Sequence, residues 1–237
     1  MPTIEIPYAD GAVTVYAASP SRSGPWPGVV VVHDAIGMGP EVRRQADWFA
    51  MQGFLAAAPD LFDGAGMLRC LPRIIRDYTR RQGPTFGRLD AARRWLADQA
   101  ACSGRVGVAG FCLGGDFALL LAPTGRYDAC SVNYGRVPRD AGELLRASCP
   151  VVGSYGARDR SLRGAADRLE SVLEVAGVPH DVKEYEGAGH GFLNDFRPGE
   201  IPRVTMVLGR VMNAGYHEAS AADARARILA FFRTYLA

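Results

Sequence analysis

The sequence predicts an α/β fold, with a mostly parallel, twisted sheet and helices on both of its faces. Short apolar or alternating segments recur along the 237 residues, and segments with helical periodicity separate them. Strands that alternate with helices in this way form right-handed βαβ crossovers, and therefore a parallel sheet. The strand segments at 29–32, 55–58, 106–109 and 151–153 are apolar throughout, as expected when helices cover both faces of the sheet.

The elements can be assigned in order along the chain. The predicted strands are at 3–7, 12–18, 28–33, 54–58, 105–110, 129–134, 151–155 and 180–185. The first two flank Asp10 and Gly11, which favour a tight turn, so we expect an antiparallel hairpin at one edge of the sheet. The predicted helices are at 41–52, 67–82, 86–99, 113–121, 162–176 and 219–236. Residues 197–215 show no clear pattern and form an insertion that is either a lid or a plain loop.

Length and composition indicate a single domain over residues 1–237. The chain is 48% hydrophobic and 22% charged, which supplies a full core. A net charge of +2, with arginines scattered among acids, does not indicate a nucleic-acid partner. Five cysteines without a C-x-x-C pair favour neither a zinc site nor a disulfide framework, and indicate a reducing compartment. Neither a signal peptide nor an apolar stretch of membrane-spanning length is present, so we expect a soluble cytoplasmic protein without a membrane partner. The oligomeric state stays open.

A thiol between glycines marks the end of the strand at 105–110. Cys112 lies in the motif GFCLGG at 110–115, and its glycine neighbours allow backbone to pass close to a sharp strand-to-helix turn. Such a turn exposes the sulfur, and the helix N-terminus behind it stabilises a thiolate. A dinucleotide loop is disfavoured, because G-x-G-x-x-G is not in register and no P-loop lysine follows. We therefore predict that Cys112 is a nucleophile and that the other cysteines are packing groups.

A thiol nucleophile needs a base. His190 lies in the glycine-rich motif GAGHGF at 187–192, directly after the strand at 180–185, and is the predicted base. The remaining histidines are expected to be structural: His33, His180 and His217.

The base in turn needs an orienting carboxylate. Asp159 follows the strand at 151–155, and the chain order nucleophile, acid, histidine is the order of the α/β-hydrolase arrangement. Its alternative role is the N-cap of the helix at 162–176, a post that Ser161 can fill equally well.

An oxyanion hole requires two N–H groups aimed at the developing negative charge. Leu113, the residue after the nucleophile, supplies one of them. The other is expected from the loop that follows the strand at 28–33, with Ala35 as the preferred residue.

Three motifs together resemble the signatures of the dienelactone hydrolase family. They are GFCLGG at 110–115, APDLF at 58–62 and GAGHGF at 187–192, and the resemblance spans nearly the whole chain. It implies an α/β-hydrolase fold, a Cys-His-Asp triad and hydrolysis of esters or lactones. It also implies that neither a metal nor an organic cofactor takes part.

Two positions depart from the family pattern. Asp34 stands where the family commonly has a glutamate, and it either controls the thiol or only caps its loop. Asn194 stands where enzymes that act on dienelactone carry an arginine that pairs with the substrate carboxylate, and an amide cannot form that ion pair. Dienelactone is therefore not the expected substrate. Candidates to replace the missing arginine are Arg197, Arg76, Arg80 and Arg81.

The leading hypothesis is a hydrolase that cleaves an ester or lactone bond of a small molecule through Cys112, His190 and Asp159. One alternative is a thioesterase or acyltransferase that uses the same residues. Another is a non-catalytic homologue that binds a small ligand. Residues on or just beyond the predicted carboxyl-end loops are expected to line the pocket: Ile36, Phe62, Tyr134, Phe192 and Phe196.

Overall fold

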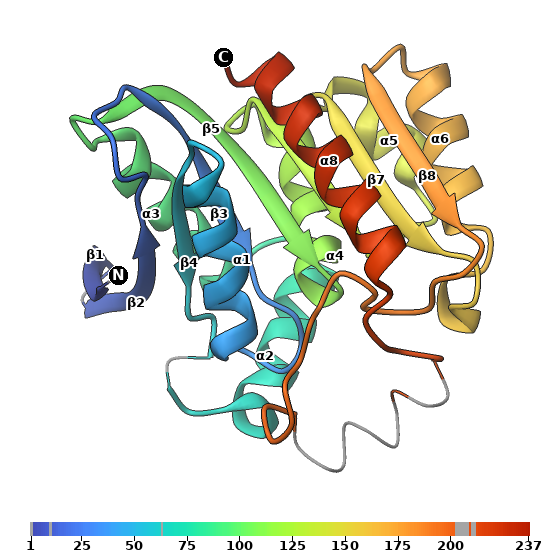
Figure 1. Cartoon of the computed structure of the whole chain (residues 1–237), viewed down its shortest axis with the longest axis horizontal. Helices are drawn as coiled ribbons and strands as arrows, with labels where there is room; N and C mark the ends of the chain where they lie inside the picture. Colours follow the sequence, from blue (N-terminus) through green and yellow to red (C-terminus); the bar gives the residue numbers. More distant parts are fainter. Residues whose placement is uncertain (1, 10, 63, 202–208, 210–211) are drawn as a thin grey trace.

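The protein is built around one eight-stranded sheet, in the strand order β1-β2-β4-β3-β5-β6-β7-β8 (Figure 1). The computed structural model describes residues 2–9, 11–62, 64–201, 209 and 212–237. The strands are β1 (Thr3–Tyr8), β2 (Gly11–Ala18), β3 (Trp26–Val32), β4 (Leu55–Pro59), β5 (Cys102–Phe111), β6 (Ala129–Asn133), β7 (Val151–Gly156) and β8 (His180–Tyr185).

The sheet is parallel from β4 to β8 and antiparallel at one edge. β2 pairs with β1 and with β4 in antiparallel register, and the other neighbouring strands pair in parallel. This arrangement confirms the predicted α/β fold with its edge hairpin. The central strands are apolar because they are covered on both sides, and the side chains from Val29 to Val32 have no exposed surface.

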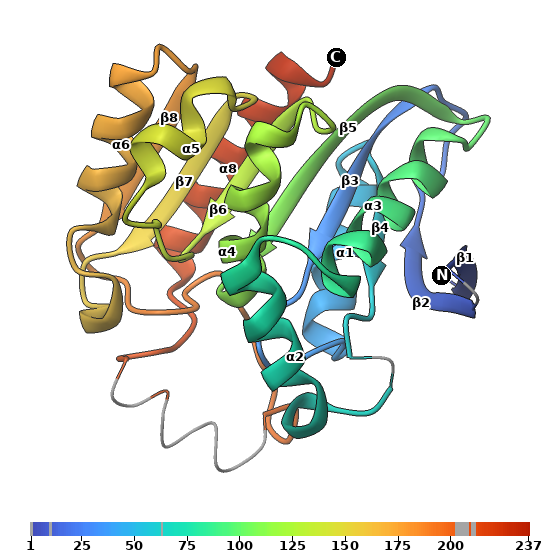
Figure 2. The same cartoon turned by 180° about the vertical axis from the view of Figure 1, so that it is seen from behind.

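Helices cover both faces of the sheet. The helices are α1 (Pro40–Met51), α2 (Met67–Arg80), α3 (Pro84–Ala97), α4 (Leu113–Leu121), α5 (Ala141–Leu144), α6 (Ala165–Val175) and α8 (Glu218–Tyr235), with 3-10 turns at Ala122–Thr124, Leu145–Ala147 and Arg160–Leu162. Figure 1 shows α1 and α8 in front of the sheet, where Phe49 and Phe232 stack at 6.0 Å. Figure 2 shows α3, α4, α5 and α6 on the opposite face. Among the described residues, no helix combines the length and apolarity needed to cross a membrane.

Two elements differ from the predicted pattern. The helix expected at 162–176 is divided into a 3-10 turn, Arg160–Leu162, and α6, because Gly164 between them has a φ of +72° and interrupts the helical path. The short helix α5 was not expected, since four residues carry too little periodicity to be recognised. Of the insertion predicted at 197–215, residues 202–208 and 210–211 lie outside the described residues.

Candidate active site

Cys112 occupies a strained turn between β5 and α4. Its backbone has a φ of 53° and a ψ of −118°, a conformation that a residue with a side chain rarely adopts. The neighbouring glycines make this turn possible, because a Cβ at Gly110 would lie 2.0 Å from the carbonyl oxygen of Gly114. A Cβ at Gly114 would lie 2.1 Å from the carbonyl oxygen of Val32. The glycines therefore serve close backbone packing, and Cys112 stays partly exposed at the end of the sheet.

His190 and Asp159 form a buried hydrogen-bonded pair. Nδ1 of His190 donates to Oδ2 of Asp159 over 2.5 Å, and both side chains are almost fully enclosed. The other carboxylate oxygen, Oδ1, accepts hydrogen bonds from N–H and Oγ of Ser161 at 2.9 and 2.6 Å. Asp159 is thus both the N-cap of the turn Arg160–Leu162 and the partner of His190, so the two roles considered for it are compatible.

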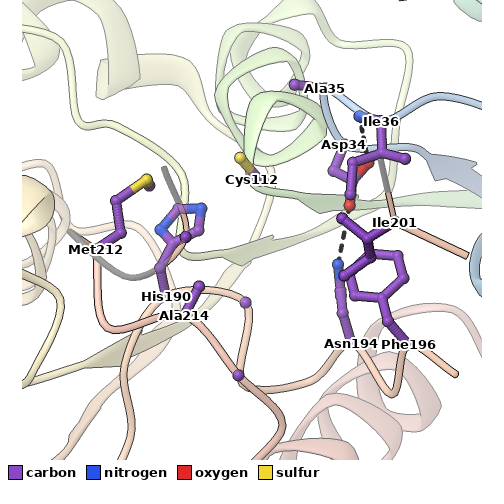
Figure 3. A pocket seen from close by; sticks show the side chains of 13 residues that line it. Asp34, Ala35, Ile36, Cys112, His190, Asn194, Phe196, Ile201, Met212 and Ala214 are labelled. Carbon is purple, nitrogen blue, oxygen red and sulfur yellow. Dashed lines mark hydrogen bonds between the residues drawn. The ribbon is translucent and has the colours of Figure 1, made fainter. Parts of the chain in front are cut away.

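The ring of His190 is turned toward the sulfur of Cys112 (Figure 3). Burial alone lowers the pKa of His190, but the hydrogen bond to Asp159 and the nearby thiol of Cys112, together with the charges of both groups, outweigh it and raise this pKa to about 10. Burial likewise raises the pKa of Asp159, and the hydrogen bonds from His190 and Ser161 bring it below its ordinary value. At neutral pH the pair is therefore an imidazolium next to a carboxylate. Nε2 of His190 makes no hydrogen bond within the described protein.

These groups open onto a cavity of about 420 Å³ at the carboxyl ends of the strands. Its wall is mostly apolar, and the ionisable side chains among its described lining residues are Asp34, Cys112 and His190. The lining consists of Asp34, Ala35, Ile36, Cys112, His190, Gly191, Asn194, Phe196, Ile201, Gly209, Met212, Ala214 and Gly215. A cavity of this size suits a small molecule, and an apolar wall with few polar groups is typical of small-molecule sites.

Of the two predicted oxyanion donors, one lies on the lining of this cavity, and the other directly follows Cys112, which is also on the lining. Leu113 is the first residue of α4, so its N–H has no partner within the helix. Ala35 lies on the cavity wall. The N–H groups of Ile36 and Gly37 bond to Asp34, whereas the N–H of Ala35 has no partner among the described residues. Neither N–H group therefore has a hydrogen-bond partner among the described residues.

Asp34 is enclosed in the wall of the cavity. Its Oδ1 accepts from the N–H of Ile36 at 2.7 Å, and its Oδ2 accepts from Nδ2 of Asn194 at 3.0 Å. Burial raises the pKa of Asp34 to about 6, although hydrogen bonds from Ile36, Gly37 and Asn194 act in the opposite direction. Asp34 thus caps its own loop, which is one of the two roles considered for it, while facing the cavity that contains the thiol.

Part of the expected pocket lining is wrong. Ile36 and Phe196 line the cavity, but Phe62, Tyr134 and Phe192 are buried outside it. Phe62 packs edge-on against His33, and Tyr134 packs between His190 and Phe192. These aromatic side chains follow strand ends, as expected, but their loops bury them in the hydrophobic core.

None of the arginines proposed to replace the missing family arginine lies on the described lining. Arg81 pairs with Asp140 at 2.7 Å, and Arg76 lies 3.8 Å from Asp77. Arg80 and Arg197 are exposed. Asn194 itself lines the cavity, with both ends of its amide already engaged by protein groups.

Several lining residues were missed, namely Ile201, Met212 and Ala214. They belong to the insertion at 197–215, where no sequence period marked an inward face.

Glu41, the second residue of α1, is a buried acidic residue that the sequence did not reveal. It is 3% exposed and accepts a hydrogen bond from Gln45 at 2.7 Å. Its one sequence signal is an acidic residue in a first helical turn, which is usually exposed.

The other histidines have structural partners. The ring of His33 bonds to the carbonyl oxygen of Asp34 and accepts from the N–H of Leu61. His180 bonds through Nδ1 to the carbonyl oxygen of Val178, and His217 caps α8 by accepting from the N–H of Ser220. In the part of the chain that the structure describes, no group of three or more potential ligands is arranged to hold a metal ion.

Comparison with known proteins agrees with this architecture. The family model described as "Dienelactone hydrolase family" matches residues 13–236. A Rhodococcus opacus protein named carboxymethylenebutenolidase is 27% identical, over 97% of this chain and 89% of its own length. An Azospirillum brasilense protein, provisionally named carboxymethylenebutenolidase, is 30% identical over the full length of both chains.

Solved structures give the same answer for the fold. A Klebsiella pneumoniae structure, provisionally named a dienelactone hydrolase, superposes with a TM-score of 0.80 at 25% identity, over 99% of this chain and 98% of its own. A dienelactone hydrolase-like promiscuous phosphotriesterase from metagenomic libraries superposes equally well at 23% identity, over 100% and 99% of the two chains, which supports the fold alone. The chain therefore belongs to the dienelactone hydrolase family and has the α/β-hydrolase fold.

Proposed function

We propose that this protein hydrolyses an ester or lactone bond of a small molecule, with Cys112 as nucleophile, His190 as acid and base, and Asp159 as the residue that orients His190. One observation carries the proposal. A partly exposed sulfur at a strained turn faces a histidine that is held by a buried carboxylate, on the wall of an apolar cavity. This is the relation of nucleophile, base and orienting group that covalent acyl transfer requires.

Acylation begins with the thiolate of Cys112, whose proton has passed to His190. The sulfur attacks the carbonyl carbon, an S–C bond forms, and the carbonyl oxygen becomes an oxyanion. The N–H groups of Leu113 and Ala35 are suited to stabilise this charge, because neither bonds to another described residue. When the intermediate collapses, the C–O bond to the alcohol breaks, and the imidazolium of His190 gives its proton to the leaving oxygen.

Deacylation uses the same groups in reverse. Neutral His190 takes a proton from water, and the hydroxide formed attacks the thioester carbon. The S–C bond then breaks, which releases the carboxylic acid and restores the thiolate beside the imidazolium. Asp159 holds Nδ1 of His190 throughout, so that Nε2 faces the sulfur and the reacting oxygen.

The cavity favours esters and lactones over peptides. A thiolate readily attacks the activated carbonyl of an ester or lactone. Cleavage of a peptide bond is harder, because the amine is a poor leaving group and needs a more effective proton donor. The apolar wall formed by Ile36, Phe196, Ile201 and Met212 suits the hydrocarbon part of such substrates.

A substrate panel with the Cys112→Ala variant tests the proposal. Aryl esters, alkyl esters and five- and six-membered lactones are assayed with the wild type, with Cys112→Ala and with Cys102→Ala. Cys102 is also partly exposed but lies at the opposite end of β5, so Cys102→Ala is the matched control. We expect Cys112→Ala to lose at least about 10³-fold in kcat and Cys102→Ala to keep wild-type turnover. Turnover that survives in Cys112→Ala contradicts the proposal.

A further inference from the structure

Three buried polar side chains connect the loops around the cavity, and we call them the polar strap: Tyr134, Asn194 and Asp34. They are 1%, 5% and 6% exposed. The hydroxyl of Tyr134 donates to Oδ1 of Asn194 over 2.5 Å, and Nδ2 of Asn194 donates to Oδ2 of Asp34 over 3.0 Å. The strap is therefore a continuous chain of hydrogen bonds with Asn194 at its centre.

Each member comes from a different loop at the carboxyl edge of the sheet. Asp34 follows β3, Tyr134 follows β6, and Asn194 lies in the loop after β8, four residues beyond His190. The N–H of Asn194 also bonds to the carbonyl oxygen of Gly191 at 2.8 Å, which makes its position part of the histidine loop itself. The strap thus joins three loops that the sheet alone does not hold together.

At one end, the strap fixes the loop that carries Ala35. Oδ1 of Asp34 accepts from the N–H of Ile36 at 2.7 Å, and this bond closes a turn around Ala35. Since Asn194 holds Oδ2, the carboxylate is bound through both oxygens and cannot rotate freely. Figure 3 shows this arrangement, with Asp34 bonded to Ile36 and to Asn194.

At the other end, the strap is anchored beside the histidine. The ring of Tyr134 lies 5.2 Å from the ring of His190, and it also packs against Phe192 at 5.7 Å. Tyr134 has a φ of 42°, and its N–H bonds to the carbonyl oxygen of Ser154 at 2.8 Å, so its backbone is held in a conformation unusual for a residue with a side chain. The strap therefore begins at Tyr134, whose backbone is fixed and whose ring lies next to the ring of His190.

We propose that Asn194 is a positioning residue, which holds the turn around Ala35 at a fixed place relative to His190 by bridging Tyr134 and Asp34. The inference rests on the proposed function, because it concerns the distance between an oxyanion donor and the base. Both ends of the amide are occupied, so Asn194 acts on the protein rather than on a substrate. Donors that are already in place when charge develops stabilise a transition state more than donors that must first reorganise.

Removal of the amide leaves two buried groups without partners, the hydroxyl of Tyr134 and Oδ2 of Asp34. In Asn194→Leu we expect kcat to fall by about 10- to 100-fold, within the range for a weakened oxyanion donor, while KM changes by less than about threefold. A change confined to KM would mean that Asn194 binds substrate, and it would overturn the proposal.

An exchange of the two side chains provides the decisive test. In Asp34→Asn alone, one of three bonds is lost. Either one amide NH₂ faces another, or the bond to Ile36 is broken, or the amide of Asn194 flips and leaves the buried hydroxyl proton of Tyr134 without its acceptor. In Asn194→Asp alone, two carboxylates face each other. In the double variant Asp34→Asn/Asn194→Asp, the amide at 34 can donate to the carboxylate at 194 and still accept from Ile36. The hydroxyl of Tyr134 can donate to the same carboxylate. Every bond of the strap is thus restored, while the negative charge moves from position 34 to position 194.

We expect the double variant to have a kcat at least about tenfold above that of either single variant, as interacting pairs give non-additive effects. If Asp34 acts instead through its own charge, Asp34→Asn and the double variant will be equally impaired, and the proposal is overturned. If Asn194→Leu does not fold, the exchange variants still test the role of Asn194. Thermal melting shows which of these variants are folded, and only folded variants are compared. If Cys112→Ala keeps its turnover, the proposed function is overturned. If turnover depends on Cys112 but is the same in the wild type, the single variants and the double variant, only the positioning role of Asn194 is overturned.

Discussion

Oδ2 of Asp159 accepts a hydrogen bond from Nδ1 of His190 over 2.5 Å, while Oδ1 of the same carboxylate caps the turn Arg160–Leu162. The capping bonds from Ser161 fix the plane of the carboxylate, and the carboxylate then fixes the plane of the imidazole. The orientation of the proposed base is therefore set by a local turn that follows β7, before any substrate is present.

Asp159→Asn should impair turnover far more than stability. The amide can still cap the turn through its oxygen, but its NH₂ then faces Nδ1 and favours the wrong tautomer of His190. We expect kcat to fall by about 10³- to 10⁴-fold. Ser161→Ala is the control: it removes the 2.6 Å bond from Oγ but keeps the backbone N–H bond, so its kcat should fall by less than about tenfold. Similar losses in the two variants would contradict the orienting role.

His190 should control the reactivity of Cys112 toward iodoacetamide. The pKa of His190 is raised to about 10, so the ring is positively charged at neutral pH, and a cation beside a sulfur favours the reactive thiolate. In His190→Gln we expect the rate constant for alkylation of Cys112 at pH 7 to fall at least about tenfold. Peptide mass mapping separates Cys112 from Cys102, whose rate should not change. An unchanged rate at Cys112 would show that the ring does not activate the sulfur.

Glu41→Gln should change how stability depends on pH. Burial raises the pKa of Glu41 to about 7, although the hydrogen bond from Gln45 opposes this. The folded protein therefore retains a proton on Glu41 between its ordinary pKa of 4.5 and about 7, which the unfolded chain releases. The contribution of Glu41 to stability is thus greatest below pH 4.5 and is lost as the pH rises through 7. The Tm of Glu41→Gln minus the Tm of the wild type should therefore be more positive at pH 8 than at pH 5.

Glu200→Gln is the contrasting control for this measurement. The hydrogen bond from Arg44 lowers the pKa of Glu200 to about 2, so its contribution is present above the ordinary pKa of 4.5 and is lost as the pH falls through 2. This variant should lower Tm by a similar amount at pH 5 and pH 8. If Glu41→Gln also shifts Tm equally at both values, Glu41 does not titrate as the structure indicates.

Gly114→Ala should be strongly destabilising, whereas Gly142→Ala should not. A Cβ at Gly114 would lie 2.1 Å from the carbonyl oxygen of Val32, so β3 and α4 would have to separate. We expect a loss of more than about 3 kcal/mol in the free energy of unfolding, or no folded protein. Gly142 lies within α5 with no atom within 4 Å of the added Cβ, so alanine there should be neutral or stabilising by up to about 1 kcal/mol. Urea unfolding of both variants measures the difference.

The sequence by itself determined most of the helices and strands and the sharp turn at Cys112. Apolar runs such as Val29 to Val32 require burial on both faces, and this requirement depends only on neighbouring residues. The glycines of the motif at 110–115 have an equally local meaning, since residues without a Cβ are needed where backbones touch. Parallel strands bring their carboxyl ends to one edge of the sheet. Asp159 and His190 follow two such strands, β7 and β8, so the sequence could also predict that they lie at the same edge as Cys112.

Only the tertiary structure decided which side chains face the cavity and which are buried in the core. Phe62, Tyr134 and Phe192 follow strand ends just as Ile36 does, yet the paths of their loops bury them in the core. The pairing of Asp34 with Asn194 spans 160 positions along the chain. No local period encodes such a pair, because its geometry depends on how three loops pack against one another. The physical reason is that periodicity reports the burial of each segment, whereas contacts between loops depend on the completed fold.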